Sequence, residues 1–542
     1  MASLTQTSQT PTSEVYSQED FIPQTPEYSP TKAVYYSVNF GPGDSYTLTN
    51  YNQVSSNGEH YKSSFEIKNT PVALANALRR TFSSLCPTVT FNDSYESKSI
   101  VVNNNTSSLH NEFITHRISL IPINMTDNHN LSFNTKFNEK TSKRMYSFTD
   151  STMIPVFSLN IKNNLKSAGL RDQFGIINVT SNDFEIKLGE DTILDTQHFF
   201  KPDVFTGEPI LINKLKSNIS DENEGEEMNI QCFPRIGLGK QNARHDPTGT
   251  VTYEFEIDNE DEVEKVFNHK IQRLQQERLS KKLNTLSETE IDKLHKSFNL
   301  LDKQRVYTRN DSGEPNHFKY SVESIGFLNP DQIVIDSVFN LILNLVDLRN
   351  SIKFNTDKTP VKLESNSKVE INNLTSKVGE GLSIKIHDEN HTAGNLIQHY
   401  LRTKYLADTK NPENRLAIAS YRMPHPTVEE IEFILVPSKD LNKPEMISEI
   451  DNIFNLINSN KHVEHPELKI DGLQEIDNLK LTHMFLTCLF IDAINLTLSD
   501  LSDFLVAFKL QSQIENTTYS TEDSDTYINN TNNTRINGKL GN

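Results

Sequence analysis

Residues 69–91 read NTPVALANALRRTFSSLCPTVTF, and residues 107–123 read SSLHNEFITHRISLIPI. The first stretch predicts a helix with defined ends. Thr70 suits the N-cap, because its hydroxyl can accept from free first-turn amides, and Pro71 suits the first helical position. Pro87 ends the helix. Apolar residues at helical spacing predict a buried stripe at Ala75, Leu78, Phe82 and Leu85. The second stretch carries another stripe at Leu109, Phe113, Ile114 and Ile118.

The pattern of the first stretch occurs again far downstream. Residues 393–397 (AGNLI) align with residues 74–78 (LANAL), and an extended apolar segment precedes each copy, at 382–386 and at 64–67. Both regions are expected to run strand, helix, strands, long helix. A small sheet cannot cover such a helix stripe alone, and packing the two units together buries both. The sequence therefore predicts an α+β fold with two related units in an intramolecular pseudo-dimer.

The composition describes an acidic chain with few cysteines. It has 542 residues, 53 Lys+Arg against 72 Asp+Glu, and a net charge of -19, which favours protein partners over direct nucleic-acid binding. No signal peptide is expected in the polar start, and the apolar run 484–498 is too short and too polar to span a bilayer. Cys86, Cys232 and Cys488 lie far apart, which disfavours a disulfide framework or a zinc site and fits a reducing compartment.

Composition shifts along the chain predict its domain organisation. Alternating short segments between Asn, Gly and Pro indicate an inserted mainly β domain, and the Ser287/Glu290 spacing indicates a capping box inside a helical hairpin. The predicted segments are a disordered tail at 1–34, a first unit at 35–124 and 310–350, the inserted β domain at 125–256, a helical insertion at 257–309, a linker at 351–377, a second unit at 378–514 and a disordered tail at 515–542. Within the second unit, residues 439–480 look like a further insertion.

Two groups of polar residues are candidates for catalytic or metal sites. His387, Asp388 and His391 resemble part of a metal or phosphohydrolase site, but they fall at a strand-to-helix junction, where such residues serve as turn and cap residues. His110, Glu112 and His116 fall on different faces of any helix through them. We therefore expect no catalytic residue, metal or cofactor.

Two further features favour contacts with a protein. The loop Gly237-Leu238-Gly239-Lys240 lacks the longer frame and the Ser/Thr of a phosphate loop, so its glycines are better explained by the close approach of another backbone. Arg79 and Arg80 are candidates for a phosphate grip, but they lie on a helix whose apolar stripe faces elsewhere. They could instead make bidentate contacts to a partner's carboxylates or carbonyls.

These segments resemble a known family. Residues 74–80, 86–89 and 109–122 look like the signature of the alpha-like assembly subunit of multisubunit DNA-directed RNA polymerases, which is the third-largest subunit in eukaryotes and the D-like unit in archaea. Residues 236–247 resemble that family's loop in the inserted domain, and 318–326 its return strand. Residues 388–396 and 419–426 are similar to the small alpha-like partner, the L-like unit of archaea. The chain thus resembles a fusion of both subunits, similar to that of large nucleocytoplasmic DNA viruses.

The resemblance implies a non-catalytic assembly platform. Its expected partners are the largest and second-largest polymerase subunits and a small subunit, with DNA met only through the complex and no membrane contact. Its pseudo-dimer seam would comprise Ala75, Asn76, Leu78, Phe82, Leu85, Gly394, Asn395, Leu396 and Ile397. Large-subunit contact candidates are Arg79, Arg80, His116, Arg117, Gly237, Gly239, Lys240, Arg244 and Pro247. The expected location is intracellular, in the host cytoplasm at the viral factory, and in the virion.

Some family members carry a cysteine-rich zinc loop in the inserted domain, which this chain lacks, since Cys232 stands alone there. Two rival hypotheses stay open. One is a stand-alone interaction or virion protein that kept the fold without a polymerase. The other is a metal-dependent hydrolase that uses His387, Asp388 and His391.

Overall fold

The computed structural model describes residues 36–40, 44–56, 59–124, 133–138, 143–148, 154–163, 175–188, 192–203, 206–217, 225–310, 313–352, 368–375, 379–406, 415–438, 441–459 and 477–512. The disordered tails predicted at 1–34 and 515–542 lie outside these residues.

The first unit is an antiparallel sheet with two helices. Its strand order is β1-β2-β3-β16-β15. The strands are β1 (Tyr36–Phe40), β2 (Asp44–Ser56), β3 (Glu59–Lys68), β15 (Thr248–Phe255) and β16 (His317–Ser324), and the helices are α1 (Val72–Ser84) and α6 (Pro330–Ser351). Asn329 caps α6 by accepting from the amide of Asp331, and Pro330 opens its first turn.

The inserted domain lies between the two parts of the first unit. Its main sheet has the order β11-β10-β8-β13-β5, and three smaller ladders pair β12 with β9, β14 with β4, and β6 with β7. The strands are β4 (Pro87–Thr90), β5 (Ile100–Asn105), β6 (Phe133–Asn138), β7 (Lys143–Phe148), β8 (Val156–Lys162), β9 (Ile176–Thr180), β10 (Glu185–Leu188), β11 (Thr192–Leu194), β12 (Leu211–Lys216), β13 (Glu227–Cys232) and β14 (Arg235–Leu238). The short helices are η2 (Tyr95–Ser97), α2 (Asn111–Ser119), η5 (Ser181–Asp183), α3 (Thr196–Phe199) and η6 (Ala243–His245).

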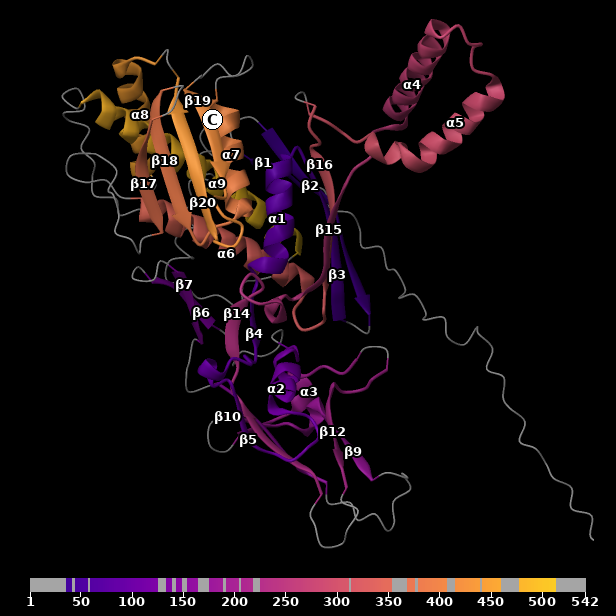
Figure 1. The fold of residues 1–542 in the computed structure, drawn as a ribbon, viewed down its shortest axis with the longest axis vertical. Helices are drawn as coiled ribbons and strands as arrows, with labels where there is room; N and C mark the ends of the chain where they lie inside the picture. Colours follow the sequence, from indigo (N-terminus) through magenta and orange to yellow (C-terminus); the bar gives the residue numbers. More distant parts are fainter. Residues whose placement is uncertain are drawn as a thin grey trace, which may run out of the picture.

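The second unit repeats the plan of the first. A four-stranded antiparallel sheet of order β17-β18-β20-β19 carries one short and one long helix on the same core. Its elements are β17 (Val369–Thr375), β18 (Glu380–His387), α7 (His391–Tyr405), β19 (Leu416–Arg422), β20 (Glu430–Pro437), α8 (Lys443–Ser459) and α9 (Asn478–Ser512). Figure 1 shows the two units side by side, with the inserted domain below them.

Helix α9 joins the two units. It packs against α7, α8, β18 and β20 of its own unit, and against α6, β1 and β2 of the first. One continuous apolar core therefore runs through both units and the inserted domain. Within the described residues, α9 is the one helix long and apolar enough to cross a membrane, yet 83% of its most apolar window is buried inside the protein. Burial in this core accounts for its apolar composition.

Two helices form an arm apart from this core. Helices α4 (Glu260–Ser280) and α5 (Glu288–Leu301), followed by η7 (Lys303–Arg305), leave the body where β15 ends and return to β16. The capping box predicted at Ser287 and Glu290 is present. Figure 1 shows the arm projecting away from both units.

The α+β fold with two related units is confirmed, while several local predictions differ from the structure. Thr70 does not cap α1. Its amide donates to the Asn316 carbonyl (3.0 Å), which extends the β3–β16 pairing past the expected cap, and its hydroxyl points back to the Lys68 carbonyl (3.4 Å). Phe113 is 66% exposed, because it is offset by about 100° around α2 from the buried Ile114.

The strand pairing also differs from the predicted segment boundaries. Strand β15, expected in the inserted domain, pairs with β16 in the first unit's sheet, and β5, expected in the first unit, joins the inserted domain's sheet. Strand β17 lies inside the predicted linker 351–377, where its buried Val369 and Ile371 alternate with less buried residues. Each of these segments is short, and pairing with a distant strand decides its place.

Candidate assembly interface

The two units meet along paired helices. Helix α1 packs against α7, and α6 packs against α9. The predicted stripe faces inward, with Ala75, Leu78 and Phe82 fully buried and Leu85 9% exposed. On α7, Leu396 and Ile397 are fully buried. Both stripes belong to the core that runs through the two units, and on the α1 side Phe82 also meets Tyr320 of the first unit's own sheet.

The other predicted seam residues have local partners. Asn76 accepts two hydrogen bonds from Arg79, at 3.1 and 3.2 Å, along the same helix. Asn395 is exposed. A Cβ on Gly394 would lie 2.6 Å from the Tyr421 ring, so this glycine lets α7 approach β19 inside the second unit. The predicted set as a whole stays a prediction.

An aromatic cluster at the seam was not predicted. Phe65 of β3 stacks on Tyr320 of β16 (centroids 5.0 Å apart) and meets Phe508 of α9 edge-on at 5.1 Å. The Tyr320 hydroxyl donates to the Ala75 carbonyl at 2.7 Å, so the cluster also anchors α1. Burial raises the pKa of Tyr320 well above its usual value, which keeps this donor protonated. In the sequence, the i, i+4 spacing of Phe504 and Phe508 is a feature that could have indicated this cluster.

Polar residues complete the seam. Arg349 of α6 donates to Asn495 of α9 at 3.1 Å. Inside the second unit, Asp492 of α9 accepts from Lys404 (2.9 Å) and from the Tyr405 hydroxyl (2.5 Å) of α7. These bonds fix how α9 sits on α6 and α7, because a shifted register would leave the groups buried without partners.

Three of the candidates for large-subunit contact lie at the junction of the two units instead. Arg80 Nε donates to Thr392 Oγ1 at 2.8 Å, at the start of α7. Lys240 Nζ donates to the Asp388 carbonyl (2.8 Å) and pairs with Glu429 (2.9 Å). A Cβ on Gly239 would lie 2.1 Å from the Ser83 carbonyl, so the close backbone approach expected there is made to α1.

The ion pairs at this junction surround a pocket of about 270 Å³. The β6–β7 hairpin reaches both units, since Arg144 pairs bidentately with Asp347 of α6 (2.8 and 2.9 Å) and Lys143 lies 3.5 Å from Asp388. Lys368 pairs with Glu389 at 3.0 Å. Burial alone would lower the pKa of Lys240, but the nearby carboxylates outweigh burial and raise it. The junction is therefore a charge-balanced clamp.

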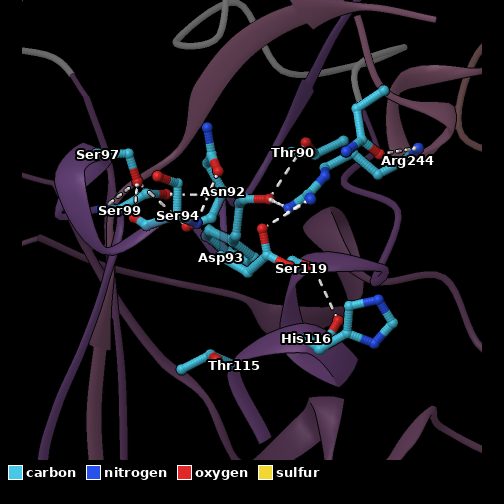
Figure 2. Close-up of polar contacts among 12 residues, drawn as sticks. Thr90, Asn92, Asp93, Ser94, Ser97, Ser99, Thr115, His116, Ser119 and Arg244 are labelled. Carbon is cyan, nitrogen blue, oxygen red and sulfur yellow. Dashed lines mark hydrogen bonds and ion pairs between the residues drawn. The ribbon is translucent and has the colours of Figure 1, made fainter. Parts of the chain in front are cut away.

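The remaining candidates hold the inserted domain in place. Arg244 pairs with Asp93 at 2.7 Å, and Figure 2 shows this pair beside the serine-rich turn that carries Asp93. Gly237 faces the ring of His245, which is buried between Thr88 and Thr90. Burial, helped by Arg244, lowers the pKa of His245 to about 4, so the ring is neutral at pH 7. Pro247 is buried, and its carbonyl accepts from the Ile325 amide.

Helix α2 carries the last two candidates. Arg117 donates to the carbonyls of Leu211 (2.9 Å) and Ile212 (2.8 Å), and His116 is exposed (Figure 2). Phe113 and Leu120, 66% and 54% exposed, share this face at i, i+3, i+4, i+7 spacing. The outer face of α2, defined by Phe113, His116, Arg117 and Leu120, is thus an uncovered apolar and basic surface.

The three residues of the hydrolase hypothesis, His387, Asp388 and His391, each contact different residues. His387 lies between Glu370 (3.2 Å) and Glu430 (3.3 Å), Asp388 faces Lys143, and His391 meets the Tyr421 hydroxyl at 3.2 Å. Among the residues that the structure describes, no three His, Cys, Asp or Glu side chains are grouped as a metal site.

Fold and seam together define a protein whose two halves dimerise through paired helices within one chain. The family model of the RNA polymerase Rpb3/Rpb11 dimerisation domain matches residues 64–345, just over half of the chain. The chain belongs to this family. The match covers the inserted domain and most of the first unit, without β1 and β2, and the second unit lies beyond it.

Of three similar proteins, two carry polymerase names. The Arabidopsis thaliana protein "DNA-directed RNA polymerases II, IV and V subunit 3" is 29% identical over 195 residues, 36% of this chain and 53% of that protein. The Dictyostelium discoideum protein "DNA-directed RNA polymerase II subunit rpb3" is 25% identical over 308 residues, 53% of this chain and 90% of that protein. The Tetrahymena thermophila "Conjugation stage-specific protein" is 27% identical over 237 residues, 42% of this chain and 63% of that protein. The chain spans about half the length of the Arabidopsis relative.

Proposed function

We propose that the chain is the non-catalytic assembly platform of a DNA-dependent RNA polymerase and unites both alpha-like units in one polypeptide. The observation that supports this most is the intrachain packing of α1 on α7 and of α6 on α9. Covalent linkage makes this dimerisation intramolecular and raises the effective concentration of the second unit. Catalysis would then belong to other subunits.

The proposed partners are the largest and second-largest subunits and a small subunit of the polymerase. The outer face of α2 is the proposed docking surface for a large subunit, because its exposed Phe113 and Leu120 flank His116 and Arg117. Arg80 and Lys240 are instead engaged with the second unit, and we assign them to the intramolecular clamp.

The proposal extends to the origin and location of the protein. A fusion of the two units resembles the one expected in large nucleocytoplasmic DNA viruses, which would place the protein in the host cytoplasm, at the viral factory, and in the virion. Support comes from Cys86, Cys232 and Cys488, which are buried free thiols, as a reducing compartment would leave them.

The test is affinity purification of the tagged chain from cells that express the whole polymerase, followed by mass spectrometry and a template-dependent transcription assay. Two very large partners and RNA synthesis are expected. Phe113→Asp should release a large subunit yet leave the chain folded, because the side chain is 66% exposed. Val428→Asp, at a 48% exposed site on the second unit, is the matched control and should retain both partners.

A folded chain that purifies without large partners or polymerase activity would contradict the proposal and favour the stand-alone interaction protein. If Phe113→Asp keeps both large subunits while the polymerase itself is recovered, the platform role stands and the docking surface lies elsewhere.

A further inference from the structure

The α4–α5 arm is rigidly mounted on the first unit. At its foot the Phe255 ring stacks on Tyr307 (centroids 4.8 Å apart), and the Arg309 guanidinium lies 4.4 Å from the Tyr307 ring centroid. Backbone bonds from Asp258 to Val306 and from Thr308 to Glu256 tie the outgoing and returning chains together. Figure 1 shows the arm extending from this foot away from the body.

The arm covers its own apolar residues poorly. Its small core consists of Val263, Phe267 and Phe298 and is separate from the main core. Five of the sixteen exposed large apolar residues in the described part of the chain lie between 266 and 301, with Leu300 the most exposed of all at 77%. Leu300 and Leu301 adjoin at the end of α5, and adjoining exposed apolar side chains favour a protein-binding surface.

The charges of the arm are unevenly distributed. Residues 260–305 contain ten Lys/Arg and nine Asp/Glu, but four of the acidic residues lie at the start of α4, at 260–264, so the rest of the arm has ten Lys/Arg against five Asp/Glu. Lys270, Arg278 and Lys281 are paired with carboxylates of the arm. At physiological ionic strength charges are screened within about 8 Å, so a ligand on α5 would feel mainly the charges in its immediate surroundings.

Cations and leucine share one face of α5. Lys293, Lys296 and Leu300 follow each other at i, i+3 and i+7, which aligns them along the outer side, away from the buried Phe298. Lys303 continues the row. Within the described residues, none of these three lysines has a carboxylate within 4 Å. The row therefore offers unpaired positive charge beside uncovered apolar surface.

We propose that the outer face of α5 together with the start of η7, defined by Lys293, Lys296, Leu300 and Lys303, binds an acidic amphipathic helix of a second protein. The ligand's apolar side would cover Leu300 and the neighbouring Leu301, and its carboxylates would pair with the lysines. Phosphate binding by nucleic acid would use the lysines but leave the leucines uncovered, so a protein ligand accounts for both features. This proposal is independent of the polymerase role.

The test measures fluorescence anisotropy of labelled probes with the purified full chain. The main probe is a helical peptide of about 20 residues, roughly 30 Å long, with leucines on one side and glutamates on the other. Its scrambled version, its lysine counterpart and a 20-base-pair DNA duplex are the comparison probes. The acidic amphipathic peptide should bind at least about tenfold more tightly than each comparison probe.

Matched variants locate the binding surface. Leu300→Ser/Leu301→Ser and Lys293→Glu/Lys296→Glu should each weaken peptide binding about tenfold or more, and these exposed sites can change without loss of the fold. Val428→Ser, an exposed site on the second unit, should bind as the parent does. Equal binding of the scrambled peptide, tighter binding of the duplex, no binding, or unchanged binding by the leucine variant would each overturn the proposal.

Discussion

Gly237 and His245 show how single residues hold the inserted domain on the first unit. A Cβ at Gly237 would lie 2.4 to 2.7 Å from three ring atoms of His245, which is itself packed between Thr88 and Thr90. Gly237→Ala should therefore lower the free energy of unfolding by about 1–3 kcal/mol, the usual cost of overpacking. Gly249→Ala, where the nearest atom is 3.6 Å away, is the control in the same urea titration. Equal stability of the two variants would contradict this account.

His245 also predicts a pH dependence. Its folded pKa of about 4 lies below the unfolded value near 6.5, so the unfolded chain binds the proton more readily. The stabilisation is complete above pH 6.5 and is lost as the pH falls toward 4, by about 3 kcal/mol at most. As the pH falls through this window, the unfolding free energy of the parent should drop relative to that of His245→Gln by up to this amount. Other histidines with a lowered pKa, such as His317 and His399, affect the pH dependence of both proteins equally, so their effect cancels in the difference between the two unfolding free energies.

At the scale of elements, the packing of α1 against α7 requires that apolar side chains stay buried away from water. Leu78 is fully buried, and an aspartate there would place an uncompensated charge among apolar side chains. Leu78→Asp should cost about 4 kcal/mol or more and abolish polymerase assembly. Asn395→Asp, exposed on α7, should change stability by less than about 0.5 kcal/mol. Urea unfolding and recovery of the large subunits are the two measurements, and normal assembly of Leu78→Asp would show that the seam lies elsewhere.

Helix periodicity predicted the helices well because it reports which face must be buried. The stripe Ala75, Leu78, Phe82 and Leu85 is buried as predicted from spacing alone. Phe113 was predicted in the apolar stripe but is exposed, because its position around α2, and not its apolar character, decides its exposure. Thr70 was predicted as a helix cap but does not act as one, because its hydrogen bond to Asn316, distant in sequence, outweighs the local capping preference.

At the scale of the whole molecule, the sequence predicted the two related units and a helical seam between them, but not the ion pairs at their junction. Lys143, Lys240 and Lys368 come from three separate segments and converge on the turn 387–391 and its neighbour Glu429. Nothing local in the sequence marks such a meeting point, because it exists only once the β6–β7 hairpin, the 237–240 loop and the second unit are packed. For the same reason Arg80 and Lys240, predicted to face a partner, contact the second unit of the same chain.

The seam predicts that the chain can be divided. Fragments 1–360 and 361–542, cut between α6 and β17, should form a heterodimer when co-expressed, because α1–α7 and α6–α9 contacts and the Phe65–Phe508 cluster need no connecting peptide bond. Linkage supplies effective concentration alone, so the divided protein should melt at a temperature that rises with concentration, while the intact chain should not. Light scattering and melting at several concentrations measure this. Fragments that stay apart at high micromolar concentration would show that the units depend on covalent linkage, in conflict with a self-sufficient dimerisation interface.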